Sequence, residues 1–400
     1  MTATSPLACA MADLLMRPAG RRRRAFLAVL ALLGFVAIGL PEGALGVAWP
    51  SIRATFGVPL SALGGLLAVY TAGYLAASLA SGRVMARAGI GRQLAGATAI
   101  GTAGFAVTAA APGWGALLAG AVLVGVAGGT LDAAINTYVA IHHGLRSLSL
   151  LHAAYGVGAT AAPLALTAVL HSGGSWRGAY AGLVVFESAV VAGFFTTRRD
   201  WDEPAPAASG VPREADGPSP PAAARRATAV LVLMFFVAVG VEATAGQWAF
   251  SLLTVERGVS LATAGAWTGG FWASLTAGRL VVGAFGSRLV PDQILGVAVA
   301  GIVAGAVLLW WSPTPALGAA GLLVIGFTEA AVFPTLVAVT PARVGAERAP
   351  AVIGYQVAAA AIGGAAVPAL TGVAADVATL EVVGPVLLAG GIALAVLSRA

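Results

Sequence analysis

Acidic side chains in the middle of long apolar stretches are the groups of this sequence that could do chemistry. In residues 125–139, GVAGGTLDAAINTYV, Asp132 and Asn136 are four positions apart, which puts them on one face of the segment if it is helical. A charge in an apolar helix is costly unless it faces a partner or a water-filled cavity, so Asp132 indicates a substrate or ion path. The alternative is a buried acid that neighbouring helices satisfy.

Other acids lie in comparable apolar surroundings, at Glu42, Glu187, Glu242 and Glu329. A carboxyl held away from water can take up and release a proton, which makes Asp132 a candidate proton carrier, and Glu42 could share that task. The same acids would also suit a proton-coupled exporter, because a carboxylate can pair with a cationic compound in low-dielectric surroundings.

Neutral polar residues in the apolar stretches could bind a solute. Donors and acceptors for a polyhydroxylated substrate are expected at Asn136, Tyr155, Gln247 and Gln356. His152 would suit a proton relay near neutral pH, and an interfacial histidine without that role is an equal alternative. Stacking on an apolar sugar face, or ordinary helix packing, would explain Trp49, Trp248 and Trp272.

The residue sets of an enzyme or a metal site are missing from the sequence. His142 and His143 are adjacent but have no third ligand nearby, so a solvated loop explains them better. The chain has no lysine and therefore no phosphate-binding loop of the GxxxxGK[ST] type. Its single cysteine, Cys9, cannot form a disulfide within the chain. We expect no enzymatic activity, no metal and no cofactor.

Composition predicts a membrane protein. Of the 400 residues 59% are hydrophobic and only 10% are charged, whereas soluble domains are about 25% charged. Twelve apolar runs are long enough to cross about 30 Å of hydrocarbon as helices. They cover approximately residues 25–49, 60–84, 94–111, 114–141, 148–170, 178–196, 227–254, 261–285, 294–311, 313–340, 349–374 and 382–397.

The arginines predict how the chain is oriented in the membrane. All 22 basic residues are arginines, and with a cytoplasmic N-terminus only Arg53, Arg177 and Arg257 fall in loops on the far side. Both termini are therefore expected in the cytoplasm. The net charge of +6 follows from the same bias, so we expect the arginines to contact membrane lipids and not nucleic acid.

Two halves of the chain repeat one another. ASLASGR at residues 77–83 corresponds to ASLTAGR at residues 273–279, and E-x-x-x-G begins at both Glu42 and Glu242. This pattern is typical of a transporter built from two related bundles. We predict an all-α membrane protein with twelve transmembrane helices in two pseudo-symmetric six-helix bundles. The chain is expected to consist of an N-terminal cytoplasmic tail (1–24), a first bundle (25–198), a flexible cytoplasmic linker (199–226) and a second bundle (227–400).

With these motifs the chain resembles the major facilitator superfamily and, within it, the fucose permease-like sugar:proton symporters. The segment from residue 82 to 92, GRVMARAGIGR, resembles the superfamily's signature loop between spans two and three, although Ala86 stands where that signature has an aspartate. The resemblance implies a gating role for Gly82, Arg83, Arg87 and Arg92, and for Gly278 and Arg279 in the second half.

The closer resemblance rests on LDAAINTYV, on GVSLATAGAWTGGFWASLTAGRL and on GFTEAAVFPT. It implies that Asp132 is the essential acid of span four and that Asn136 accompanies it. The family's first-span acid falls on Gly46, one turn after Glu42, and its span-five glutamine and asparagine fall on His152 and Tyr155. The fold implied places spans one, four, seven and ten around the cavity, which favours the acids in those spans over Glu187.

These observations predict a proton-coupled transporter that works by alternating access and imports a small, sugar-like polar solute across the cytoplasmic membrane of a bacterium. An exporter of drugs or metabolites is the alternative. The expected partners are the solute, protons and lipids, and the expected functional unit is a monomer.

Overall fold

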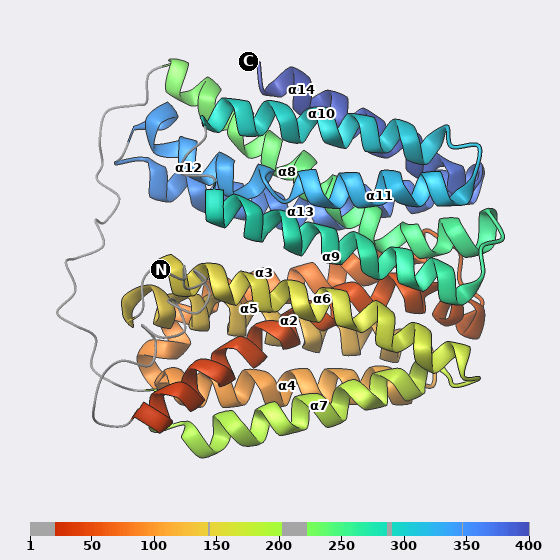
Figure 1. Ribbon diagram of the computed structural model, residues 1–400. Coiled ribbons are helices and arrows are strands. Elements are labelled where there is room, and N and C mark those ends of the chain that lie inside the picture. The colour runs from red at the N-terminus through yellow and green to blue at the C-terminus, as the bar shows by residue number, and fades with distance from the viewer. Residues whose placement is uncertain (1–20, 143–144, 202–221, 286–289, 346, 400) are drawn as a thin grey trace, which may run out of the picture. The chain divides into compact units, whose positions relative to one another are not determined.

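The computed structural model describes residues 21–142, 145–201, 222–285, 290–345 and 347–399. Within these ranges every regular element is helical, which confirms the predicted all-α membrane fold (Figure 1). Helices suit this sequence because hydrocarbon offers no hydrogen-bond partner, so each span must satisfy its own backbone. His143, Cys9 and most of the predicted linker lie outside the described residues.

Among the described residues, six helices precede the linker and the others follow it. The first group is α2 (Arg21–Phe56), α3 (Ala62–Ala88), α4 (Ile90–Ala110), α5 (Trp114–His142), α6 (Leu145–His171) and α7 (Trp176–Thr197). The second group is α8 (Ala222–Ser251) with the π-helical turn η1 (Leu252–Glu256), α9 (Leu261–Phe285), α10 (Pro291–Trp310), α11 (Pro315–Glu329), α12 (Val332–Val344), α13 (Ala349–Val377), the 3-10 turn η3 (Leu380–Val382) and α14 (Val383–Leu397).

Each of the twelve predicted apolar runs corresponds to one of these helices or to a consecutive pair, and no run extends more than two residues beyond it. Among the described residues, ten helical segments are long and apolar enough to cross a membrane. The two remaining runs form α4 and α9, which have 21 and 25 residues and are rich in glycine and threonine. Those residues lower the hydropathy but favour close packing between membrane helices.

Two helices differ from the sequence-based prediction. The first span was expected to end near residue 49, yet α2 continues through Pro50 to Phe56. The tenth span was expected to be continuous, yet it divides into α11 and α12 at Ala330 and Ala331. Pro334 explains this break, because a proline ring clashes with the carbonyl four residues earlier, here that of Ala330, and provides no N–H to it.

Contacts divide the chain into two compact units. One comprises Met1–Pro41, Ala72–Ala159 and Gly174–Val211, and the other Glu42–Thr71, Thr160–Gly173 and Pro212–Ala400. Because this grouping places parts of α2, α3 and α6 in the second unit, the predicted division at the linker stays a prediction.

Each unit has an apolar core of its own. The first is centred on the buried side chains of Phe35, Leu94, Ile135, Phe194 and Trp201. The second contains the fully buried Phe235, Trp248, Phe271 and Trp272. There α8 packs along α13, and α10 lies between α11 and α14 (Figure 1).

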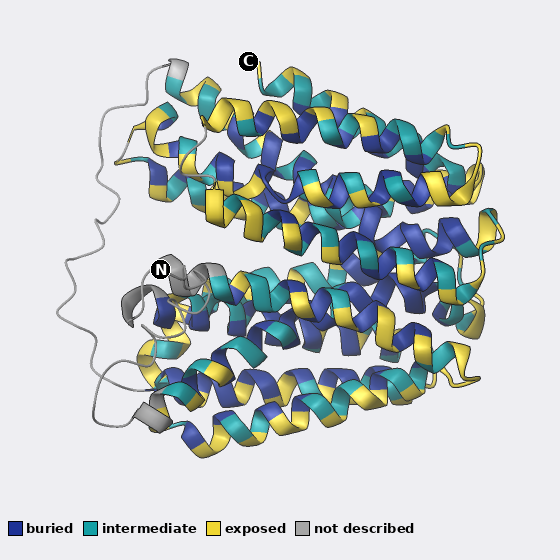
Figure 2. Ribbon diagram, in the orientation of Figure 1, coloured by how far each residue is buried: buried dark blue, intermediate teal, exposed yellow. Residues whose placement is uncertain are grey.

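Large apolar side chains also lie on the outside of the helices. Leu79, Val185 and Val297 are 82%, 73% and 72% exposed, and exposed positions recur along the helices of both units (Figure 2). In water such surfaces would drive aggregation, whereas in a bilayer lipid tails cover them.

Candidate functional site

Asp132 is held by two hydrogen bonds in the first unit. The Tyr74 hydroxyl on α3 donates to Asp132 Oδ2 at 2.6 Å, and the Asn136 side-chain amide donates to Asp132 Oδ1 at 2.8 Å. Asp132 and Asn136 therefore share one face of α5, as their spacing predicts. Both oxygens of this half-buried carboxyl are oriented by neutral donors, so no basic residue is needed to fix it.

Close contact between α3 and α5 brings Tyr74 to this acid. A Cβ atom on Gly129 would lie 2.9 Å from the Tyr74 Cα atom, so only glycine lets the two backbones meet there. Gly129 precedes Asp132 by about one turn, and the contact consequently places the tyrosine ring beside the carboxyl.

His152 on α6 is the ionisable neighbour of this acid. It interacts electrostatically with Asp132, and its exposed ring packs edge-on against Phe35, with the ring centroids 5.6 Å apart. The structure thus brings four residues together in the first unit, and the histidine among them is exposed. This arrangement is compatible with the predicted proton relay.

A second acidic cluster lies in the second unit, and an arginine is at its centre. Arg279 on α9 donates from Nη2 to both oxygens of Glu242 on α8, at 3.2 and 3.3 Å. The side chains are only 23% and 13% exposed. Glu42 on α2 and Glu329 at the end of α11 are each repelled by Glu242 and attracted by Arg279. We call these four residues the acid–arginine cluster.

Glu329 occupies the break between α11 and α12. Its side chain is 3% exposed, and Oε2 has no hydrogen-bond partner among the described residues. An interrupted membrane helix is a common way to build a binding site, because the helix ends offer polar groups at mid-membrane depth. The buried oxygen and the interruption coincide here, so Glu329 is available to bind a proton or a cation.

Two further polar atoms near the cluster are buried and unsatisfied. Gln247 donates from Nε2 to the backbone oxygen of Glu42 at 3.2 Å, but its Oε1 has no partner among the described residues. The same holds for Nε1 of Trp272, whose ring packs against Gly246. Buried polar atoms are normally hydrogen-bonded, so one acceptor and one donor without partners among the described residues suit a polar ligand.

Ionisation of all three carboxyl groups in the acid–arginine cluster would be unfavourable in free energy. Three carboxylates and one guanidinium would give a net charge of −2 in surroundings that exclude most water. Binding of a proton or a cation lowers that charge. The cluster is therefore suited to take up one positive charge and to release it when its surroundings change.

Other predicted residues lie in ordinary packing contacts. Gln356 is fully buried and donates to the Thr340 hydroxyl at 2.9 Å, and Trp248 donates from Nε1 to the Pro368 carbonyl at 3.0 Å. Glu187 is 3% exposed and its Oε2, like that of Glu329, has no hydrogen-bond partner among the described residues, but it lies inside the uninterrupted helix α7. Tyr155 is half-buried on α6.

The predicted gating residues occupy two different environments. Gly82, Arg83, Arg87 and Arg92 are exposed around the α3–α4 turn, where Gly89 has a positive φ of 80° that favours glycine. Gly278 and Arg279 instead lie inside α9, where Gly278 contacts the α11–α12 junction. Their gating role stays a prediction.

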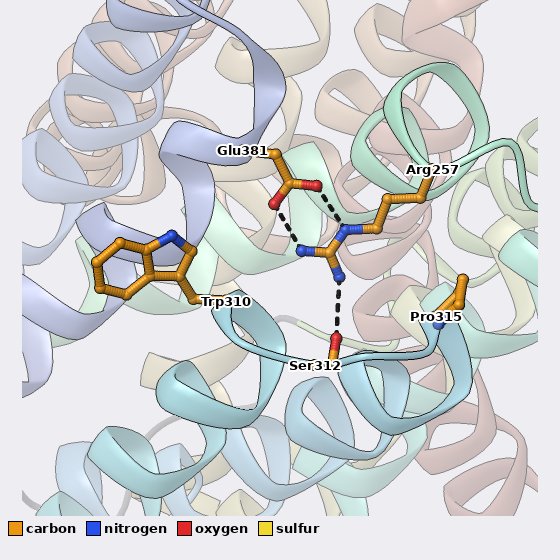
Figure 3. Close-up of a pocket in the computed structure, with 5 residues that line it drawn as sticks. All are labelled: Arg257, Trp310, Ser312, Pro315 and Glu381. Atoms are coloured by element: carbon orange, nitrogen blue, oxygen red, sulfur yellow. Dashed lines mark hydrogen bonds and ion pairs between the residues drawn. The ribbon is translucent and has the colours of Figure 1, made fainter.

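A pocket of about 340 Å³ is lined by residues that belong to neither cluster (Figure 3). It is lined by Arg257, Trp310, Ser312, Pro315 and Glu381. Arg257 donates from Nε and Nη2 to the Glu381 carboxylate at 2.7 and 2.6 Å, and from Nη2 to the Leu309 carbonyl at 2.8 Å. The guanidinium thus caps the end of α10 and ties it to η3, which makes this a structural contact.

Sequence reasoning missed Tyr74 and predicted a different role for Arg279. Tyr74 gave no signal beyond being a tyrosine in an apolar span. Arg279 was assigned to gating because it ends a repeated motif, although it lies six residues before the end of α9 and so well inside an apolar helix. That position was the available signal, since an arginine inside a membrane span needs a partner.

Comparison with known proteins gives the family. The sequence model of the Major Facilitator Superfamily matches residues 30–368. The chain belongs to this superfamily. It is accordingly a multi-pass membrane transporter and not an enzyme. No curated protein matches the chain significantly.

Solved structures show how widely this superfamily fold is shared. A mutant of the nucleoside transporter NupG is 14% identical with a TM-score of 0.73, over 94% of this chain and 98% of that one. A bacterial homologue of the human lysosomal transporter Spinster is 15% identical with a TM-score of 0.71, over 99% of this chain and 96% of that one. A variant of the E. coli fucose:proton symporter FucP is 16% identical with a TM-score of 0.62, over 94% of this chain and 97% of that one. At these identities the likeness concerns the fold alone.

Proposed function

We propose that this superfamily member is a proton-coupled secondary active transporter that imports a small polar solute. The acid–arginine cluster carries this proposal, because three carboxyl groups share one guanidinium there and one of them lies at a helix break. Uptake of a proton by Glu42 or Glu329 would lower the charge of the cluster. Coupling follows if solute binding and protonation stabilise the same conformation.

Asp132 provides a second proton-binding group in this proposal. Its two neutral donors orient the carboxyl, and His152 can relay protons to it. Asn136 remains able to bond a solute through its amide oxygen. Each unit would then have one titrating group with one amide, namely Asp132 with Asn136 in the first unit and Glu329 with Gln247 in the second.

The substrate is proposed to be an uncharged, hydroxyl-bearing molecule such as a sugar. Such a molecule donates and accepts hydrogen bonds, and the buried Gln247 Oε1 and Trp272 Nε1 offer one acceptor and one donor that have no partner in the described part of the chain. We further propose a monomer in the bacterial cytoplasmic membrane, with both termini in the cytoplasm and arginines at the lipid headgroups.

Export of an organic cation is a second candidate, and the same surplus of acid favours it. An ammonium group could replace the proton as the positive charge that the cluster binds. In that case protons would compete with the cation for Glu42 and Glu329. The two candidates differ in whether the solute and the proton move together or in opposite directions.

Transport into proteoliposomes separates these candidates. The purified full-length protein would be tested with radiolabelled hexoses, nucleosides, dipeptides and quaternary amines, with and without an imposed pH gradient. We expect one neutral polar class to accumulate only when protons move inward with it. Glu329→Gln should lower this accumulation to the level seen without a gradient, whereas Glu187→Gln, which alters another buried glutamate, should leave it intact.

Two outcomes would count against proton-coupled import. Accumulation of a quaternary amine only under the opposite gradient would favour the exporter. Equal accumulation with and without a gradient, unchanged by Glu329→Gln, would rule out proton coupling through the acid–arginine cluster.

A further inference from the structure

An aspartate near the end of α13 binds the start of α3. Asp376 accepts hydrogen bonds from two consecutive backbone N–H groups, that of Leu60 at Oδ1 (2.7 Å) and that of Ser61 at Oδ2 (2.9 Å). The two segments are more than 300 residues apart in the sequence. Each carboxylate oxygen thus receives one donor, which is the arrangement of a helix cap supplied by a distant helix.

The chemistry of this contact favours a carboxylate. The first N–H groups of a helix have no partner within it, and the helix dipole gives that end a partial positive charge. Leu60 and Ser61 directly precede α3. Arg53, in the last turn of α2, adds a favourable charge interaction with Asp376, and its Nε holds the α2–α3 turn by donating to the Val58 carbonyl at 3.2 Å.

Small residues extend the contact along α13. Ala369, Gly372 and Asp376 recur at helical spacing and so share one face. A Cβ atom on Gly372 would lie 3.2 Å from both the Leu60 oxygen and the Ser61 Cα atom. One on Gly64 would lie 2.6 Å from the Ala369 Cβ atom. Larger side chains at either glycine would therefore hold the two helices apart.

Trp248 fixes this part of α13 against α8. Its indole Nε1 donates to the Pro368 carbonyl at 3.0 Å, and a Cβ atom on Gly372 would lie 2.9 Å from its Cζ2 atom. The tryptophan is fully buried. The tryptophan thus lies on the same face of α13 as the start of α3 and ties that face to α8.

We propose that Asp376 is a latch that holds this side of the transporter closed and opens in each transport cycle. The contact joins a segment of the first predicted bundle to one of the second, next to the loop predicted to lie opposite the cytoplasm. Alternating access requires such contacts to break when that side opens. The latch depends only on alternating access, so it holds whether or not transport is proton-coupled.

Distance measurements between spin labels test the latch in the full-length protein. With Cys9→Ser as background, labels at Ala54→Cys and Val377→Cys would report on the two segments, since both positions are exposed. Asp376→Ala should raise the ratio of the longer to the shorter distance roughly fivefold or more, as is typical of coupled equilibria. Asp376→Asn, which keeps one acceptor oxygen, should give an intermediate ratio.

Matched variants make the result specific. Asp292→Ala removes another exposed aspartate, which pairs with Arg343 at 3.3 Å, and should leave the ratio unchanged. Gly64→Val should act like Asp376→Ala by wedging the helices apart, whereas Gly65→Val, where a Cβ atom would meet nothing within 4 Å, should not. An unchanged ratio in Asp376→Ala, or equal shifts in the two glycine variants or in the two aspartate variants, would overturn the latch.

Discussion

Arg279→Met should lower the free energy of unfolding by about 3–5 kcal/mol, because removing one partner of a buried ion pair leaves the other charge uncompensated. Here three carboxyl groups would lose the one guanidinium that acts on them. The variant should also fail to accumulate solute. Chemical unfolding of the purified protein in detergent, followed by tryptophan fluorescence, would give the free energy.

A second arginine provides the control for this variant. Arg343 pairs with Asp292 at 3.3 Å, nearly the distance between Arg279 and Glu242, but Asp292 is 78% exposed. Arg343→Met should therefore cost no more than about 1 kcal/mol. Adding Glu242→Gln to Arg279→Met removes one carboxylate and should restore part of the lost stability. Equal losses in the two single variants would show that Arg279 does not serve as a buried counter-ion.

Asp132→Asn should reduce proton-driven accumulation to the level measured without a gradient, while solute exchange without net proton movement stays partly intact. The substitution keeps the shape of the side chain and an acceptor for Tyr74, but removes the titrating group. Tyr74→Phe removes only one donor to the carboxylate, and should lower the accumulation rate by roughly tenfold, as the loss of a charge-assisted hydrogen bond suggests. Accumulation by Asp132→Asn equal to that of the wild type would eliminate Asp132 as a carrier.

The overall fold was predictable because it depends on the composition of the chain and on the length and spacing of its apolar and polar residues. Twelve apolar runs of sufficient length and one acid–amide pair at helical spacing can be recognised without knowing which helices touch. Pro334 favours the break at Glu329, but it alone would not have located the break, because Pro50 and Pro368 lie inside continuous helices. The tenth span was predicted to be continuous because hydropathy alone does not show where a proline interrupts a helix.

The partners of the acids were not predictable in the same way. Tyr74 reaches Asp132 only because Gly129 lets α3 and α5 approach, and the two side chains are 58 residues apart. Arg279 meets Glu242 through the packing of α9 on α8. A sequence read by itself gives the type and the depth of a buried charge, whereas the identity of its counter-ion depends on tertiary packing.

Proton movement during solute entry is the most direct readout of the carboxyl clusters. Proteoliposomes containing a pH-sensitive dye and no imposed gradient would receive the transported solute from outside. We predict that the interior of wild-type vesicles acidifies as solute enters, that Glu187→Gln behaves alike, and that the double variant Glu42→Gln with Glu329→Gln shows no acidification. Solute entry into wild-type vesicles without any change of internal pH would contradict proton coupling.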